Sequence, residues 1–263
     1  MKILFIADVV RKSGVEAVRI LLPKLVTQHL IDLVIANGEN IDGGGLTPDT
    51  AETLLKSGVN VITTGNHTWQ PRYSRELLSK RPLVLRPINL PGSSLEDGYA
   101  ILNVPGLRSK VTIINLLGKI NMGNEYIDNP FTAISHLLTS IGEQAKVIII
   151  DFHAQYTDEK RLMGHYLDGR VSALLGTHTH VGTIDARILP KGTAYITDIG
   201  MVGASNSVIG VAVEPVIERF LTQMPTTFRD AEGPVTFNSV VIDVDEESGK
   251  ATDIFRVDDS VSL

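Results

Sequence analysis

Short apolar runs that each end in a residue type used for metal binding are the feature that most limits how this chain can fold. The runs are typical of buried β-strands, and helical patterns separate the first of them along the chain. In open α/β sheets, ligands bind outside the carboxyl ends of the strands, so side chains placed directly after such runs meet at one edge. The pattern therefore predicts a parallel sheet with a functional site at its strand ends.

Five strand ends contribute to the candidate site. They share Asp, Glu, Asn and His side chains, and they are Asp8, Gly38-Glu39-Asn40, Gly65-Asn66-His67, Asp151-Phe152-His153 and Thr177-His178-Thr179-His180. A role in stability alone would not explain why these residue types fall at the same position relative to each strand. We therefore expect a metal site with several ligands.

The absence of cysteine from the 263 residues narrows the chemistry of that site. Disulfides, thiolate nucleophiles, sulfur-ligated zinc and iron–sulfur clusters are excluded, and nitrogen and oxygen ligands remain. Iron, manganese, zinc and magnesium all accept such ligands to differing degrees. A chain without cysteine is also compatible with a reducing compartment, and we expect a cytoplasmic protein.

Charge and hydropathy limit the partners. The formal net charge is −6, and no dense stripe of Lys and Arg is present, which argues against binding of long nucleic acids. No segment reaches the ~20 apolar residues of a membrane span, so we expect no membrane partner. A small phosphate ligand remains, because metal charge can hold it without a basic surface. We expect one domain over residues 1–263, and a homo-oligomer is compatible with the sequence.

Periodicity gives a coarse order of elements. We expect strands at 2–7, 32–36, 59–64, 83–85, 146–151 and 171–176, and a hairpin formed by 99–104 and 110–116. Helices are expected from about Gly14, with Ser13 and Glu16 as a capping box, and over 47–58, 72–79, 131–141 and 214–222. Later runs at 186–189, 194–197, 239–244 and 254–257 indicate a second layer of sheet packed on the first.

The donor set suits a pair of divalent metal ions that catalyse hydrolysis of phosphate esters. Glu39 is the candidate bridging ligand because it is the only acidic residue of its motif. His178 and His180 lie two residues apart, so in an extended segment their rings would point the same way. Of the pair Asp151 and His153, we expect the histidine to bind metal and the aspartate to orient a ligand imidazole.

Asn66 and His67 receive different roles. The amide oxygen of Asn66 is a neutral ligand that keeps the site electrophilic. His67 cannot bind the same ion from the adjacent position without strain, so it is free to act as an acid, a role that imidazole side chains commonly take near neutral pH. The other histidines fit surface positions on helices, at His29 and His136, while His165 suits either the surface or the lining of a substrate pocket.

These motifs resemble the signature of calcineurin-like metallophosphoesterases. More narrowly, residues 6–10, 37–40, 64–69, 150–154 and 176–181 are similar to the YmdB-like bacterial phosphodiesterases, and the similarity continues through residues 188–198. The resemblance implies an α/β fold in which two mixed sheets pack as a sandwich flanked by helices. It also implies a dinuclear site at the carboxyl ends of the strands.

The resemblance further implies how the ligands divide. One ion would be held by Asp8, Glu39, Asn40 and His180, and the other by Glu39, Asn66, His153 and His178. His67 would be the proton donor. Relatives of this kind hydrolyse cyclic nucleotides, including 2′,3′-cyclic ones, and use iron or manganese.

Three positions depart from the family patterns. The broad superfamily opens with Asp-x-His, whereas Asp8 is followed here by Val9-Val10, so Asn40 would replace the missing imidazole. In the same pattern, Glu39 stands where an Asp commonly bridges the metals. Arg11 stands where the narrower family has Gly-rich residues. It could bind substrate phosphate or narrow the mouth of the site.

Together these patterns predict a dinuclear metal-dependent phosphodiesterase that acts on small, cyclic nucleotides. In the expected mechanism a hydroxide between the metals attacks phosphorus in line, and His67 protonates the departing ribose oxygen. One alternative is a phosphomonoesterase with the same site, although no obvious Arg pair is present to hold a terminal phosphate. The other is a metal-binding regulatory or scaffold protein with incidental hydrolysis.

Overall fold

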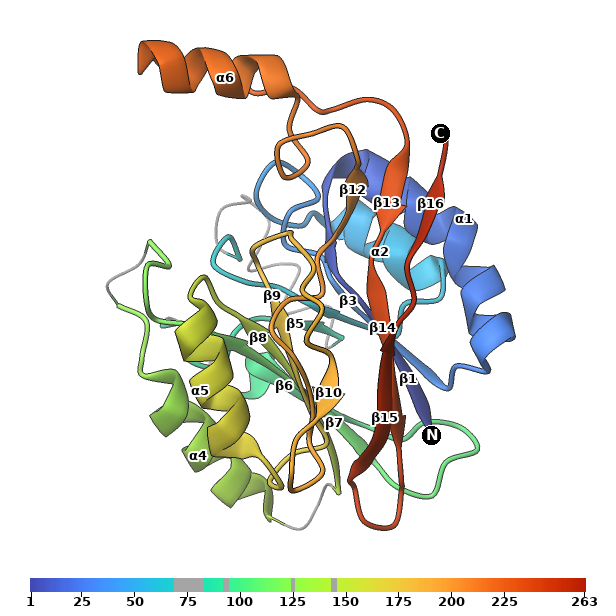
Figure 1. The fold of residues 1–263 in the computed structure, drawn as a ribbon. Helices are drawn as coiled ribbons and strands as arrows, with labels where there is room; N and C mark the ends of the chain where they lie inside the picture. Colours follow the sequence, from blue (N-terminus) through green and yellow to red (C-terminus); the bar gives the residue numbers. More distant parts are fainter. Residues whose placement is uncertain (69–82, 92–94, 124–125, 143–145) are drawn as a thin grey trace.

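Two six-stranded β-sheets pack face to face, and helices cover the outer face of each (Figure 1). The computed structural model describes residues 1–68, 83–91, 95–123, 126–142 and 146–263. Both sheets are mixed. The first has parallel strands from β1 (Lys2–Ile6) to one edge and antiparallel pairs at the other, and the second has parallel strands in the middle and an antiparallel pair at each edge. The predicted fold class, a sandwich of two mixed sheets flanked by helices, is confirmed.

The first sheet contains the amino-terminal strands. Its order is β15 (Ala251–Arg256), β14 (Ser239–Val244), β1 (Lys2–Ile6), β3 (Leu33–Asn37), β4 (Val61–Thr63) and β5 (Val84–Leu85). Strands β1, β3, β4 and β5 are parallel. Helices α1 (Arg11–His29) and α2 (Pro48–Lys56) pack on the outer face of this sheet.

The second sheet contains the central part of the chain. Its order is β10 (Arg187–Ile188), β11 (Ala194–Ile196), β9 (Ala173–Thr177), β8 (Val147–His153), β7 (Val111–Leu117) and β6 (Tyr99–Leu102), with a 3₁₀ turn at Leu95–Gly98 before β6. Strands β6 and β7 form the predicted antiparallel hairpin. Helices α4 (Pro130–Ile141) and α5 (Thr157–Leu167) cover its outer face.

The core between the sheets follows from alternation along each strand, because successive side chains point to opposite faces. In β1, Ile3 and Phe5 lie between the sheets, whereas Leu4 and Ile6 pack toward the helices. Strand β8 alternates in the same way. Both faces of these strands are buried, which explains why they are apolar without interruption.

A third, four-stranded sheet lies beside α1 and was not predicted. Its order is β16 (Asp259–Val261), β13 (Val235–Phe237), β12 (Met201–Ala204) and β2 (Asp8–Val9). The strands are two to four residues long, which is too short for a clear periodic signal. The sheet positions Asp8, because β2 pairs with β12 immediately after β1 ends.

Two of the expected helices, and one that was not expected, differ from the prediction or cannot be compared with it. Helix α1 begins at Arg11 rather than near Gly14, and its N-cap is Val10, so the predicted Ser13–Glu16 capping box is wrong. The reason is tertiary: β2 leads directly into the helix, and the Arg11 N–H donates to the Asn40 carbonyl. The helix expected at 72–79 lies outside the described residues. Helix α5 was not predicted.

Helix α6 (Val213–Thr222) projects away from the two sheets (Figure 1). Its span agrees with the predicted helix at 214–222. Among the described residues, no helix combines the length and the apolar character needed to cross a membrane.

Candidate metal centre

The inner faces of both sheets change from apolar to polar toward the carboxyl ends of their parallel strands. In β8, Val147 and Ile149 lie in the core between the sheets, and the next two positions on that face are Asp151 and His153. Asn37 and Thr177 end β3 and β9 in the same way, and both are fully buried. The sandwich therefore closes at this edge with a buried polar cluster.

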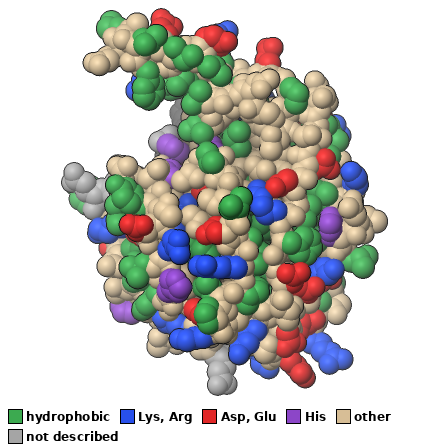
Figure 2. Space-filling view, in the orientation of Figure 1, with side chains coloured by type: hydrophobic (Ala, Val, Ile, Leu, Met, Phe, Trp, Pro, Cys, Tyr) green, Lys and Arg blue, Asp and Glu red, His purple; other side chains and the backbone are tan. Residues whose placement is uncertain are grey.

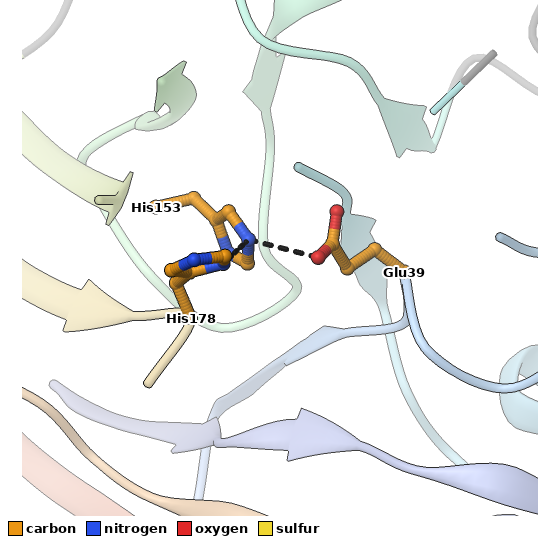
Figure 3. A group of neighbouring side chains, drawn as sticks. All are labelled: Glu39, His153 and His178. Atoms are coloured by element: carbon orange, nitrogen blue, oxygen red, sulfur yellow. Dashed lines mark hydrogen bonds and ion pairs between the residues drawn. The ribbon is translucent and has the colours of Figure 1, made fainter. Parts of the chain in front are cut away.

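Glu39, His153 and His178 form the centre of that cluster, and their side chains point toward one another from three segments (Figure 3). Glu39 Oε1 lies 2.9 Å from His153 Nε2, and His153 Nε2 lies 2.9 Å from His178 Nδ1. Glu39 and His153 are fully buried. Their ligand atoms lie within 4.8 Å of one another, as donors to a single metal ion would.

Asp8, Asn40 and His180 extend the cluster on one side. Asp8 Oδ1 lies 3.8 Å from His180 Nε2, and Asn40 Nδ2 lies 3.1 Å from the same nitrogen. The Asn40 amide also donates to Glu39 Oε1 at 3.1 Å. A metal ion is bound by the amide oxygen, so Asn40 would bind one after its amide rotates by 180°.

The loop after β4 places Gly65, Asn66 and His67 against this cluster. The His67 backbone N–H donates to Glu39 Oε2 at 3.1 Å. A Cβ at Gly65 would overlap both Glu39 Oε2 and the His153 ring, so only glycine allows the loop to come this close. Asn66 Oδ1 and His67 Nδ1 are buried and have no hydrogen-bond partner among the described residues.

The backbone conformation of the last motif differs from the expectation. His178 has φ 101° and His180 has φ 63°, so the segment is not extended and the two rings do not point the same way. His178 turns toward His153, whereas His180 turns toward Asn40. The turn thus distributes the two imidazoles between the two sides of the cluster.

A hydrogen-bond chain fixes the orientation of His153. The Thr177 hydroxyl donates to Asp151 Oδ1 at 2.6 Å, so its oxygen is left to accept from His153 Nδ1 at 2.9 Å. The Nδ1 proton of His153 is thereby held by Thr177, and Nε2 is the nitrogen that faces the cluster and would bind a metal. Asp151 acts through Thr177, in keeping with the orienting role expected of it, and Asn37 and Thr63 also donate to its carboxylate. Thr177, Asn37 and Gly65 lie in or beside the predicted motifs, but no role was predicted for any of them.

The electrostatics of the cluster follow from burial and close charges. Burial raises the pKa of Asp8 to about 6. Burial also acts to raise the pKa of Glu39, but His153 and His67 outweigh it and lower that pKa to about 2. Burial acts to lower the pKa of His153, but Glu39 and Asp8 outweigh it and raise the pKa to about 9. Burial and the nearby His153 lower the pKa of His178 to about 3.

These observations test whether the residues fit a metal ion. Asp8 Oδ1 and Asn66 Oδ1 are buried oxygens without a hydrogen-bond donor among the described residues. A buried carboxylate oxygen without a partner is strongly unfavourable, and a bound cation removes that penalty. Carboxylate, amide and imidazole donors are also the ligands that divalent transition metals accept. The residues fit the metal ions that the sequence predicts.

The side chains of Arg11, His136 and His165 form no hydrogen bond or ion pair with the proposed metal ligands among the described residues. The Arg11 guanidinium forms an ion pair with Asp230 at 3.2 Å, and its backbone has φ 60°. His136 and His165 are exposed on α4 and α5.

Comparison with known proteins identifies relatives along the whole chain. Residues 4–257 match the family model described as YmdB-like protein. A 2′,3′-cyclic-nucleotide 2′-phosphodiesterase from Bacillus subtilis is 42% identical over 258 residues, which are 98% of this chain and 96% of the relative.

Solved structures agree with this assignment. A crystal structure described as a novel phosphatase from Mycoplasma pneumoniae superposes with a TM-score of 0.92 at 33% identity, covering 99% of this chain and 93% of that one. A 5′-nucleotidase from Candida albicans shares the fold alone, with a TM-score of 0.56 at 14% identity over 98% of this chain and 50% of that one. The chain belongs to the YmdB-like protein family.

Proposed function

We propose that this protein is a metal-dependent phosphodiesterase whose substrates are small nucleotides, in particular 2′,3′-cyclic nucleotides. The convergence of Glu39, His153 and His178 on one point at the sheet edge carries the proposal. The Bacillus subtilis relative, named for hydrolysis of 2′,3′-cyclic nucleotides, supports the substrate class. A cytoplasmic location is part of the proposal, and cell fractionation tests it.

The proposed site holds two divalent ions, iron or manganese. The two ligand sets share Glu39 and are Asp8, Glu39, Asn40 and His180 for one ion, and Glu39, Asn66, His153 and His178 for the other. When bound, such a pair of ions stabilises charge on phosphoryl oxygens and makes water nucleophilic at neutral pH. Support comes from Glu39, because its two oxygens face different neighbours, His153 and the His67 N–H.

The protein's own groups complete the proposed reaction. The low pKa of Glu39, about 2, keeps this carboxylate ionised at neutral pH. The Thr177–Asp151 pair holds the His153 ring with Nε2 facing the cluster. His67, anchored to Glu39 through its backbone, would give its proton to the ribose oxygen that leaves phosphorus, which is the role of a general acid.

The substrate class is tested by comparing a diester with its monoester product. The manganese- or iron-loaded protein is expected to open 2′,3′-cyclic AMP to a nucleoside monophosphate, which chromatography detects. It should release inorganic phosphate from that product at least about 100-fold more slowly. The second candidate is a phosphomonoesterase, which the description of the Mycoplasma pneumoniae structure as a phosphatase favours. Faster release of phosphate from the monoester than opening of the ring would establish that candidate instead.

A homo-oligomer is also part of the proposal, and helix α6 supports it. Pro215 is its only buried residue, while Phe220 is 81% and Leu221 79% exposed. Hydrophobic side chains gather on this projecting helix, with charged ones beside them (Figure 2). A helix of ten residues is marginal in water without packing. A second copy is the partner we infer, because the same apolar face of a second α6, with Ile217 50% exposed beside Phe220 and Leu221, would cover this one.

Light scattering tests the oligomer. Phe220→Asp combined with Leu221→Asp is expected to convert the wild-type assembly to monomers, because it places charge in the proposed contact. Leu162→Asp, at a 61% exposed position on α5, is the matched control and should leave the mass unchanged. A monomeric wild-type protein would contradict this part of the proposal.

A further inference from the structure

The loop that carries His178 and His180 needs support from outside itself. Strand β9 ends at Thr177, and both histidines then adopt positive φ values, 101° and 63°. Such conformations are unfavourable for residues other than glycine, and they persist only where the surrounding structure imposes them. One support comes from the cluster, since Asp8 Oδ2 accepts the His178 backbone N–H at 3.1 Å.

A buried ion pair supplies the other support. Lys160 on α5 and Asp198, two residues after β11, lie 2.7 Å apart, and each side chain is 1% exposed. Lys160 Nζ donates to the Thr177 carbonyl at 2.8 Å, and Asp198 Oδ2 accepts the Thr179 backbone N–H at 3.1 Å. The pair therefore contacts the backbone on both sides of His178.

The remaining contacts of the pair also lead to backbone. Asp198 Oδ1 accepts the N–H of Gly200 at 2.9 Å, which fixes the carboxylate relative to the chain after β11. The side-chain hydrogen bonds of Lys160 and Asp198 within the described chain go to backbone atoms and to each other, and none reaches a side chain of the proposed metal ligands. The hydrogen bonds of the two residues thus act on the ligand imidazoles through the backbone of the loop.

Stability alone is a poor explanation for a charge pair in this place. Taking both charges out of water is unfavourable, and apolar replacements of buried ion pairs are often neutral or stabilising. An apolar pair could not replace the two backbone hydrogen bonds, however, because it offers neither a donor to Thr177 nor an acceptor to Thr179. The charged pair therefore serves to position the backbone at Thr177 and Thr179 rather than to stabilise the fold.

We propose that Lys160 and Asp198 are positioning residues for the metal site: their ion pair holds Thr177–Thr179 so that the His178 imidazole faces Glu39 and His153. This inference rests on the proposed metal site. Residues that orient metal ligands typically contribute about 10- to 100-fold to metal affinity. Loss of the pair should therefore weaken metal binding more than it changes the reaction of the loaded enzyme.

Direct metal titration of chelator-stripped protein tests the proposal. Lys160→Met keeps the apolar stem and removes the charge. It is expected to weaken Mn²⁺ binding by about 10- to 100-fold in calorimetry. At saturating Mn²⁺ its kcat should return to within about threefold of wild type, and KM for the diester should stay unchanged.

A double variant separates positioning from stability. Lys160→Met combined with Asp198→Asn removes both charges, so no unpaired charge stays buried. Its melting temperature should exceed that of Lys160→Met, yet its Mn²⁺ affinity should stay low. Ser172→Ala is the matched control, because this buried hydroxyl donates to the Gly249 carbonyl beside the opposite end of β9. That variant should lose stability and keep wild-type Mn²⁺ affinity.

Two results would overturn the inference. One is wild-type Mn²⁺ affinity in the folded double variant; the other is equal weakening of Mn²⁺ binding by Ser172→Ala, which would show a general response to lost stability. If Lys160→Met fails to fold, the double variant decides. Failure of the proposed metal-dependent function would be recognised by a different result, because the wild-type protein itself would then bind no Mn²⁺.

Discussion

Replacing Glu39 by glutamine is expected to remove bound metal and diesterase activity together. Glutamine keeps the size of the side chain but loses the charge, which at a pKa of about 2 is always present near neutrality. As the residue shared by both proposed ligand sets, Glu39 affects both ions at once. The loss of turnover should therefore exceed the about 10- to 100-fold typical of residues that only orient ligands. Metal analysis by mass spectrometry and a diesterase assay on the same sample measure both effects.

Glu159→Gln is the matched control for this experiment. Glu159 is also buried, but its carboxylate accepts from the backbone N–H groups of Lys119 and Ile120 and belongs to no proposed ligand set. The control variant should retain metal and activity. A Glu39→Gln protein that keeps two ions per chain and normal turnover would show that this carboxylate does not join the two ligand sets.

Replacing His67 by alanine is expected to lower turnover of 2′,3′-cyclic AMP by about 10²- to 10⁴-fold, the usual contribution of a general acid. Metal content should stay at the wild-type value, because His67 contacts Glu39 through its backbone N–H, which alanine retains. The effect should be much smaller on bis(p-nitrophenyl) phosphate, because p-nitrophenolate is a good leaving group and needs little protonation. The ratio of the two losses is the measurement.

His136→Ala controls for removal of an imidazole, since His136 is exposed on α4. It should leave both rates and the metal content unchanged. Equal losses on the two substrates in His67→Ala would assign His67 to substrate binding or to loop structure, and unchanged turnover of the cyclic nucleotide would remove it from the reaction altogether.

Much of the sandwich could be predicted because its strands are buried on both faces. The apolar runs at 2–7 and 146–151 correspond to β1 and β8, and the hairpin expected from 99–104 and 110–116 corresponds to β6 and β7. Local signals failed where partners far along the chain decide the structure. The start of α1 depends on the pairing of β2 with β12, which lies about 190 residues later. Neither segment alone has a sequence pattern that predicts this pairing.

The candidate site shows the same division. The position of Asp8, Glu39 and His153 at strand ends could be predicted, because parallel strands bring their carboxyl ends to one edge. Among the supporting residues, Asp151 was expected to orient an imidazole. Thr177 and Lys160 could not be predicted, since they act through contacts with segments that only the fold brings close. The positive φ of His178 and His180 could not be predicted either, because a histidine in the sequence does not indicate a left-handed conformation.

The dinuclear site is tested most directly by counting metal ions against activity. Protein purified without chelator would be analysed for metals, stripped, and titrated with Mn²⁺ or Fe²⁺ while hydrolysis of 2′,3′-cyclic AMP is followed. We predict about two ions per chain, loss of activity on stripping, and its recovery as the second equivalent binds. Protein that binds no metal, or that hydrolyses the cyclic nucleotide equally well when stripped, would contradict the proposed metal-dependent phosphodiesterase.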